Sequence, residues 1–217
     1  MSIGEFWTVK KRLWQDQIET IRRYYRKNLR FCFIDLSFGL VALFINPYRT
    51  CRKFLQKKEE AEIYAYGETP FTTLELIVKA AEVHPDDIWL ELGSGRGKGC
   101  FWVSCFTGSS CVGIEWVPQF VRIAKFLKAL FRVPRVSFQC ISMDEADFTQ
   151  PTIVYLYGTC LEQSKIDALF EKMKHLKEGT KVITISYPLE GGGFVLNKTF
   201  PVEYPWGSAE AYLQIKK

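Results

Sequence analysis

A glycine-rich stretch, residues 91–99 (ELGSGRGKG), follows an apolar run that begins at Ile88. An apolar strand that ends in an acidic residue and passes through a glycine turn into a helix is typical of a nucleotide-binding loop. Gly93 and Gly95 permit the turn and let a ligand lie against bare backbone. A second acid, Glu115, ends the next predicted strand twenty-two residues after Gly93, where it can accept hydrogen bonds from ribose hydroxyls.

The spacing of these glycines and acids discriminates between cofactors. A dinucleotide-binding loop has the form G-x-G-x-x-G and offers a helix N-terminus to a pyrophosphate. Here the third glycine, Gly97, comes one residue early, and Glu91 stands where it would repel a phosphate. A ligand with a ribose and an amine but no phosphate fits better, so the pattern predicts S-adenosyl-L-methionine as the cofactor. The alternative is a glycine turn that serves only the fold.

Charge is distributed unevenly along the 217 residues, a length that suits one domain with an appendage. Residues 1–60 contain thirteen Lys and Arg against six Asp and Glu, a net charge of +7, whereas the remainder has a net charge of −2. An anionic membrane, an acidic protein surface or a nucleic acid could use this basic segment. The alternative is a helix face that is simply solvated.

The seven cysteines contain no C-x-x-C pair, which argues against a zinc site and against a disulfide framework. No metal is therefore predicted. Free thiols suit a reducing compartment, and the N-terminus lacks the pattern of a secretory signal. We expect a cytoplasmic protein, with membrane association through residues 31–46 as an open alternative.

The elements that must position the glycine loop change in character along the chain. Residues 1–62 are predicted to form an N-terminal helical extension that acts as a lid or a docking element. Within it, residues 5–29 have apolar side chains at helical spacing. The apolar stretch 31–46 falls short of the ~20 residues that span a bilayer, which favours a helix packed on the main domain. Membrane contact stays open because Arg30 and Arg49 flank the stretch.

Residues 63–217 are predicted to form a Rossmann-like α/β domain, because helix and strand patterns alternate from residue 71 onward. The predicted helices are 71–83, 99–106, 118–132 and 162–176, and the predicted strands are 88–92, 111–116, 135–140, 152–157 and 180–187. This order indicates a parallel sheet with helices on both faces. Residues 191–217 contain two strand-like runs and no helix pattern, so the sheet is predicted to end in an antiparallel strand pair.

The segment 66–101, which begins YGETPFTT, resembles the class I methyltransferases and, within them, the Dot1-like branch (named for disruptor of telomeric silencing). Members of that branch carry a Y-G-E-T loop, a helix, a P/D-D turn and then D-L-G-S-G-x-G. The likeness is close over this segment, looser to about residue 187 and weak beyond. It implies an S-adenosylmethionine-dependent methyltransferase that modifies lysine in a protein substrate.

Carried over position by position, the resemblance implies a set of cofactor-binding residues. The methionine end would lie under the Y-G-E-T loop, the amino group against the first acid, and the ribose at the second. The residues at these positions, with those implied for the adenine, are Tyr66, Thr69, Glu91, Gly93, Ser94, Gly95, Lys98, Glu115, Trp116, Ser142 and Met143. Ser142 and Met143 occupy the place of an acidic and an aromatic residue in the family, which leaves Asp144 or the backbone to hold the adenine edge.

The resemblance also implies where methyl transfer takes place. The family has N-N-F-A-F after its fourth strand, where this chain has YGTCL. Tyr157, Gly158 and Thr159 would therefore line the reaction centre together with Tyr66.

Methyl transfer to an amine needs positioning, a dry site and a neutral nucleophile. Lysine loses its proton readily when apolar surroundings lower its pKa, so no dedicated base is required. The aromatic candidates for such a channel are Tyr66, Tyr157, Tyr187 and Trp206. Two alternatives stay open at this point. One is a methyltransferase that acts on nucleic acid, lipid or a small molecule, and the other is a non-catalytic Rossmann binding module.

Overall fold

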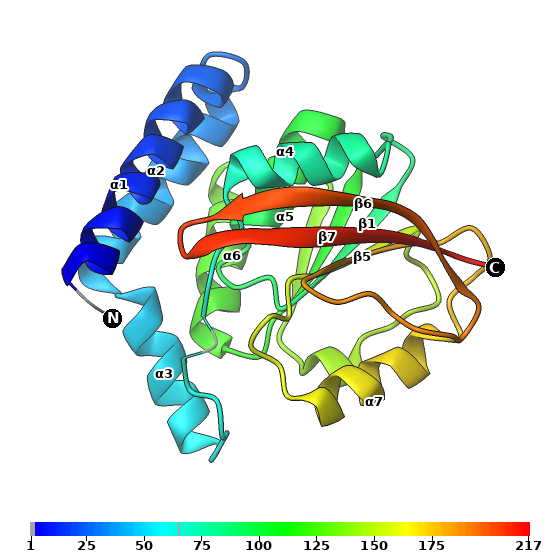
Figure 1. Ribbon diagram of the computed structural model, residues 1–217. Helices are drawn as coiled ribbons and strands as arrows, with labels where there is room; N and C mark the ends of the chain where they lie inside the picture. The colour runs from blue at the N-terminus through cyan, green and yellow to red at the C-terminus, as the bar shows by residue number, and fades with distance from the viewer. Residues whose placement is uncertain (1–2, 65) are drawn as a thin grey trace.

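A seven-stranded sheet with the strand order β3-β2-β1-β4-β5-β7-β6 forms the centre of the computed structural model (Figure 1). The structure describes residues 3–64 and 66–217, so residues 1 and 2 of the predicted extension and residue 65 before the Y-G-E-T loop lie outside it. The strands are β1 (Ile88–Leu92), β2 (Ser110–Ile114), β3 (Val136–Gln139), β4 (Ile153–Leu156), β5 (Lys181–Ile185), β6 (Phe194–Tyr204) and β7 (Gly207–Lys216).

The first five strands are parallel, and the last two run antiparallel to β5 and to each other. In register, Leu92 at the end of β1 pairs with Ile114 of β2 and with Leu156 of β4. The strand order reverses between β1 and β4, and ligands of open α/β sheets bind beyond the carboxyl ends of strands at such a point. The predicted parallel sheet and antiparallel C-terminal pair are confirmed.

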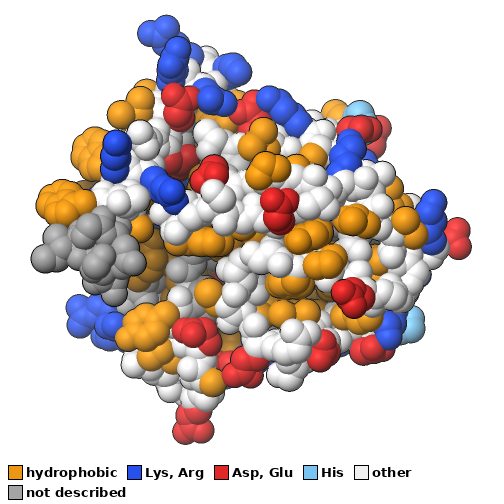
Figure 2. Space-filling view, in the orientation of Figure 1, with side chains coloured by type: hydrophobic (Ala, Val, Ile, Leu, Met, Phe, Trp, Pro, Cys, Tyr) orange, Lys and Arg blue, Asp and Glu red, His pale blue; other side chains and the backbone are white. Residues whose placement is uncertain are grey.

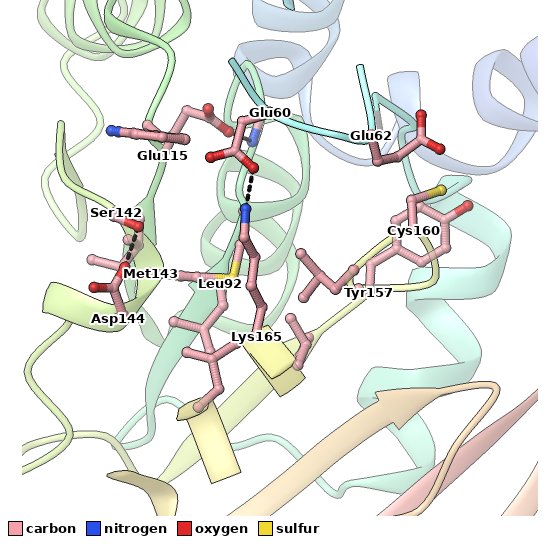
Figure 3. A pocket seen from close by; sticks show the side chains of 18 of the residues that line it. Glu60, Glu62, Leu92, Glu115, Ser142, Met143, Asp144, Tyr157, Cys160 and Lys165 are labelled. Carbon is pink, nitrogen blue, oxygen red and sulfur yellow. Dashed lines mark hydrogen bonds and ion pairs between the residues drawn. The ribbon is translucent and has the colours of Figure 1, made fainter. Parts of the chain in front are cut away.

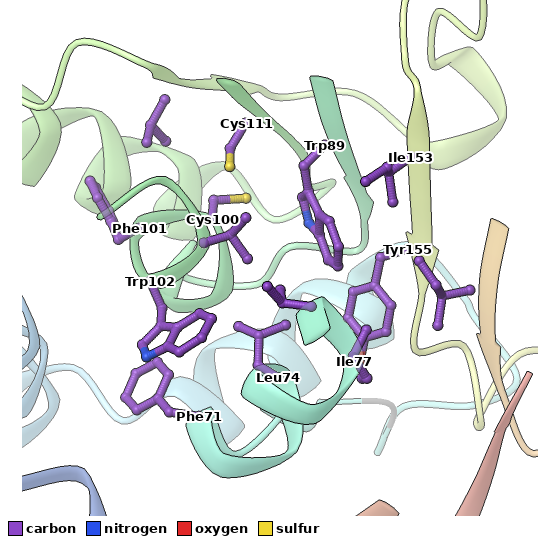
Figure 4. Packing of buried hydrophobic residues seen from close by; sticks show 14 of the residues in the cluster. Phe71, Leu74, Ile77, Trp89, Cys100, Phe101, Trp102, Cys111, Ile153 and Tyr155 are labelled. Atoms are coloured by element: carbon purple, nitrogen blue, oxygen red, sulfur yellow. The ribbon is translucent and has the colours of Figure 1, made fainter. Parts of the chain in front are cut away.

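Helices cover both faces of the sheet. Side chains alternate between faces along a strand, so Trp89 and Leu90 of β1 belong to different core clusters. The Trp89 face is covered by α4, α5 and α6, and Figure 4 shows Leu74 and Ile77 of α4 beside Trp89 and Tyr155. The Leu90 face is covered mainly by α7. The helices are α1 (Ile3–Thr20), the π-helical η1 (Ile21–Tyr25), α2 (Leu29–Phe44), α3 (Pro47–Lys57), α4 (Phe71–Ala80), α5 (Lys98–Thr107), α6 (Pro118–Leu130), the 3-10 helix η2 (Met143–Glu145) and α7 (Gln163–Met173).

The single helix predicted over residues 5–29 is divided in the structure. The α-helix ends at Thr20, and the π-helical turn that follows contains Tyr24, which is buried among aromatic rings. Asn28 then starts α2, because its side chain accepts a hydrogen bond from the Phe31 N–H (3.0 Å). A period of 3.6 residues carries no signal for the wider turn, so the sequence pattern alone extends the helix too far.

The N-terminal helices share the core of the domain. Phe31, Ile34 and Phe38 of α2 are buried with residues of α4 and α5, while the opposite side of α2 is exposed. Helix α3, capped by the side chain of Asn46, packs Cys51 against Val117 and Phe120. Residues 31–46 were predicted to pack on the main domain, and one face of α2 does so while the other face is exposed. The boundary between residues 62 and 63 stays a prediction.

Candidate active site

A cavity of about 650 Å³ lies beyond the carboxyl ends of β1, β2 and β4 (Figure 3). Its walls come from six parts of the chain: the glycine loop, the three segments after β2, β3 and β4, helix α7, and helix α3 with the residues that follow it. The lining residues that carry the argument are Leu55, Glu60, Tyr66, Gly93, Gly95, Glu115, Trp116, Met143, Tyr157 and Lys165. The cavity occupies the position where this type of sheet binds its ligands.

The glycine loop presents bare backbone to this cavity. Gly93 and Gly95 have φ angles of +74° and +55°, which residues with a side chain rarely adopt. The N–H groups of Gly93 and Ser94 both donate to the Ile114 carbonyl (2.9 and 2.8 Å), so the turn is tied to the end of β2. A Cβ atom on Gly95 would lie 3.4 Å from the Tyr66 ring. The turn thus lies directly beside the Y-G-E-T loop.

Glu115 fixes the loop from the other side. One carboxylate oxygen accepts a hydrogen bond from the Gly95 N–H (2.8 Å), and the other accepts one from the Val117 N–H (2.7 Å). Burial raises the pKa of this carboxyl to about 7, partly offset by the two amide donors. Because each carboxylate oxygen has a second lone pair, Glu115 can still accept hydrogen bonds from a ligand in the cavity.

Glu91 does not line the cavity in the structure. Its carboxylate lies under the start of α5, where a Cβ atom on Gly99 would be 2.7 Å from both of its oxygens. The Cys100 thiol donates to it (3.2 Å), and burial raises its pKa to about 7. The predicted contact with an amino group of the cofactor therefore requires a rearrangement of this side chain.

Three further predicted cofactor residues also point elsewhere. Thr69 shares a hydrogen bond with the Tyr155 hydroxyl (2.7 Å). Ser94 is buried with its side chain over Gly113, and Lys98 forms an ion pair with Asp35 of α2 (3.0 Å). Unlike Gly93 and Gly95, these residues support the walls from behind.

A buried charge network supports the Y-G-E-T loop. The carboxylate of Glu68 forms ion pairs with Arg96 (2.7 Å) and with Lys98 (3.7 Å). Arg96 also donates to the Tyr66 hydroxyl (3.1 Å) and to the Phe38 carbonyl of α2 (3.2 Å). Burial alone would raise the pKa of Glu68, but the two cations hold it below its ordinary value. Tyr66 is therefore positioned by the Arg96 guanidinium of the glycine loop, which is itself held by the Phe38 carbonyl of the N-terminal extension.

Aromatic and sulfur-containing side chains lie on the side expected to hold adenine. The Trp116 ring meets Phe54 of α3 edge to face (5.3 Å between centroids), and the Lys58 ammonium lies 5.2 Å from its centre. Met143 faces Gly93 across the cavity, at 3.7 Å from a Cβ atom built there. Asp144, which the sequence offered as a substitute acid, also lines the cavity, and its side chain is hydrogen-bonded to Ser142.

The opposite end of the cavity contains the residues expected at the reaction centre. Tyr157, Gly158 and Thr159 line it directly after β4. The Tyr157 ring stacks on Tyr204 (4.7 Å between centroids), and its hydroxyl accepts a hydrogen bond from the Trp206 indole N–H (2.7 Å). The turn between β6 and β7 thereby fixes the position of Tyr157.

The sequence analysis predicted a lid or docking role for the N-terminal extension but assigned none of its residues to the cavity wall. Cys51 and Leu55 of α3 line the cavity, and Glu60 forms an ion pair with Lys165 of α7 across it (Figure 3). These two residues lie 105 positions apart, and neither occurs in a motif. Within the part of the chain that the structure describes, no group of three or more His, Cys, Asp or Glu side chains could hold a metal ion.

The fold and the position of the cavity define a class I methyltransferase. An RNA methyltransferase from Salinibacter ruber, solved in complex with S-adenosyl-L-homocysteine, is 27% identical with a TM-score of 0.57, covering 70% of this chain and 95% of its own. A precorrin-6y C5,15-methyltransferase from Geobacter metallireducens shares the fold, with 13% identity, a TM-score of 0.51, and coverage of 66% of this chain and 87% of its own.

The family follows from the sequence profile described as "Histone methylation protein DOT1", which matches residues 49–192. The chain belongs to this family, and the resemblance stated above is confirmed. A histone-lysine N-methyltransferase specific for H3 lysine-79, from Dictyostelium discoideum, is 23% identical over 168 residues. That alignment covers 70% of this chain but only 9% of the Dictyostelium protein.

Proposed function

We propose that this protein transfers a methyl group from S-adenosylmethionine to the side-chain amine of a lysine in a protein substrate. The observation that carries the proposal is a single cavity with two chemically different ends. One end offers bare backbone and the Glu115 carboxylate, and the other offers Tyr157 with the aromatic stack behind it. Family membership supports the reaction class.

The residues present fit the cofactor. Glu115 would accept hydrogen bonds from the ribose hydroxyls, while Trp116 and Met143 would border the adenine. Gly93 and Gly95 would leave room for the chain of the methionine part beneath Tyr66. When bound, S-adenosylmethionine supplies a methyl group on a positively charged sulfur, which a neutral amine can attack.

The charge of the cavity lining as a whole favours a lysine substrate. Six acidic residues line the cavity (Glu60, Glu62, Glu115, Asp144, Glu145 and Glu162) and Lys165 is the basic one among its described lining. Such a lining attracts an ammonium group and repels the phosphates of a nucleic acid. Closer to the centre, the ring of Tyr157, which Tyr204 and Trp206 support from behind, offers an apolar wall, and an apolar wall lowers the pKa of an amine by desolvation. Positioning and desolvation are then the contributions of the protein.

Isothermal titration with S-adenosylmethionine tests the cofactor site. We expect micromolar affinity for the intact protein and none for Gly95→Val, because the side chain would meet the Tyr66 ring and require a strained φ. Gly179→Val is the matched control, since Gly179 also has a positive φ (+83°) but nothing within 4 Å of an added Cβ atom. An intact, folded protein that gives no heat would contradict both enzymatic hypotheses and favour a non-catalytic module.

Transfer of a labelled methyl group into a cell lysate tests the substrate class. The label should enter material that protease digests and nuclease does not, and acid hydrolysis should release it as methyl-lysine. Glu115→Ala provides the inactive control. A label resistant to protease would overturn the protein-lysine assignment while leaving the cofactor site intact.

The second candidate is an RNA substrate. It is favoured by the similarity to the Salinibacter RNA methyltransferase, whereas the acidic lining of the cavity argues against it. Label that is released by ribonuclease in the same experiment would identify this activity.

A further inference from the structure

Helices α1 and α2 carry rows of large apolar side chains that contribute nothing to the core. On α1 and η1 the row is Trp7, Trp14, Ile18 and Ile21, and on α2 it is Leu29, Phe33, Leu36, Leu40, Leu43 and Phe44. Their exposed fractions run from 47% at Leu36 to 88% at Phe44. Spacings of three, four and seven residues, with Phe44 directly after Leu43, place each row on one side of its helix. We call these ten residues the outer face.

Both rows point away from the rest of the protein. Helix α2 buries Ile34 and Phe38 on the side opposite its exposed row. Helix α1 turns Asp16 and Thr20 inward, and the Asp16 carboxylate accepts a hydrogen bond from Thr72 of α4 (3.2 Å). Since each helix contacts the domain through its opposite side, the outer face is a common external surface. Figure 2 shows orange side chains along this margin of the molecule, at the left.

Positive charge surrounds the outer face. Arg26, Lys27 and Arg30 are exposed at the turn that joins α1 to α2, and Arg49, Arg52 and Lys53 are exposed on α3, just after α2 ends. The row on α2 therefore has cations beyond both of its ends, and Figure 2 shows blue side chains above and below the orange ones. Residues 1–60 carry a net charge of +7 against −2 for the remainder.

We propose that the outer face is a docking surface for an anionic lipid bilayer. Apolar side chains with tryptophans, bordered by Lys and Arg, are the composition of helices that lie in the membrane interface. A second copy of the chain would bring two positively charged surfaces together, which opposes self-association. The profile of the family begins at residue 49, so the outer face lies beyond the region that the family shares.

The helices are expected to lie on the bilayer without crossing it. Along the described residues, no helix is by itself long and apolar enough to span a membrane, and α2 with α3 reaches that threshold only as a pair bent by 64°. Both members of the pair are engaged elsewhere: α2 buries Phe31 and Phe38 in the core, and α3 lines the cavity with Leu55. Among the described residues of α1 and α2, the outer face is therefore the surface that we expect to meet lipid.

Flotation with vesicles tests the surface independently of methyl transfer. The intact protein should float with vesicles of phosphatidylcholine that contain phosphatidylglycerol, and much less with phosphatidylcholine alone. Leu40→Glu with Leu43→Glu should weaken binding at least tenfold, because apolar burial is lost and negative charge is added. Phe126→Glu is the matched control, since Phe126 of α6 is 63% exposed but lies outside the outer face, and it should leave flotation unchanged.

Further measurements test that the variants are folded and that the binding is electrostatic. Far-ultraviolet circular dichroism and titration with S-adenosylmethionine establish that each variant is folded, and raising the salt concentration should weaken flotation because it screens the attraction to the lipid. The proposal is overturned if the intact, folded protein fails to float with the anionic vesicles, or if Leu40→Glu with Leu43→Glu floats as well as the intact protein. It is also overturned if sedimentation shows a dimer that those substitutions dissociate and no vesicle binding.

Discussion

Glu91 and Glu115 occupy the carboxyl ends of neighbouring parallel strands, yet they have different surroundings. Glu91 is the fourth residue of β1 and pairs in register with Gly113, whereas Glu115 follows the last residue of β2. The pleat therefore directs Glu91 to the same face as Trp89, under α5. Beyond the strand the pleat no longer applies, and backbone amides turn the Glu115 carboxylate to the cavity. A difference of two positions relative to the strand end decides which acid faces the cavity.

The largest effect on the difference between these two acids is expected from Glu115→Gln. An amide has a single acceptor oxygen, so one of the two backbone N–H groups loses its partner and the glycine loop loses its support. We expect the affinity for S-adenosylmethionine to fall about 100-fold, since an unpaired buried group costs ~1–3 kcal/mol. Isothermal titration at pH 8 measures the effect. A loss below fivefold would show that Glu115 does not organise the site.

Gly99→Ala disturbs the position of Glu91 and leaves Glu115 alone. The added methyl group would lie 2.7 Å from both Glu91 oxygens, so we expect a loss of about 1–2 kcal/mol in the free energy of unfolding, measured with urea. Gly39→Ala in α2 is the matched control, because nothing lies within 4 Å of a Cβ atom added there. This substitution should raise the free energy of unfolding by up to ~1 kcal/mol.

A double-mutant cycle sharpens this prediction. If the Glu91 carboxylate causes the clash, Gly99→Ala should cost little in a Glu91→Ala background. Equal costs in the two backgrounds would assign the loss to another contact.

The pH dependence of cofactor binding reports on Glu115. Its pKa is raised to about 7, and the ionised form is the better acceptor for ribose hydroxyls, so affinity should rise as pH rises through 7. If only that form binds, the gain between pH 6 and pH 8 is about tenfold. The amine of the cofactor also titrates, and it does so equally with both proteins. Comparison with Glu115→Gln therefore isolates the pH dependence that is due to Glu115. Parallel pH profiles for the two would contradict the assignment.

The smallest effect is expected from Glu91→Gln. Its carboxylate faces Cys100 and the start of α5, so the affinity for S-adenosylmethionine should change less than threefold in the same titration. A loss as large as that of Glu115→Gln would show that Glu91 turns into the cavity when the cofactor binds. The pair of variants therefore distinguishes a supporting acid from a ligand-binding one.

Sequence reasoning succeeded where the signal is local. The alternation of helix and strand predicts the parallel sheet, because each element is defined by the periodicity of its own residues. The glycine turn was predicted equally well, since Gly93 and Gly95 do adopt the positive φ angles that their residue type permits. The predicted strand 111–116 included Glu115, whereas β2 ends at Ile114, so the pattern located this acid near the strand end but not beyond it.

The positions of other side chains in the site depend on partners that are distant in sequence. Lys98 is next to the glycine loop in sequence, but its ammonium forms an ion pair outside the cavity with Asp35, sixty-three residues earlier. The Glu60–Lys165 ion pair likewise joins α3 and α7 without a shared motif. Glu91 could have been placed, because the alternation of side chains along β1 directs it to the face of Trp89. The sequence analysis did not apply this rule.

Helix α3 makes the N-terminal segment part of the cavity wall. Since Cys51 and Leu55 complete a wall that the strands leave open, a recombinant fragment that starts at residue 63 would inherit the catalytic loops without an enclosed compartment. The outward sides of α1 and α2 contribute nothing to this lining, so substitutions there should leave the compartment closed, whereas the loss of α3 should open it.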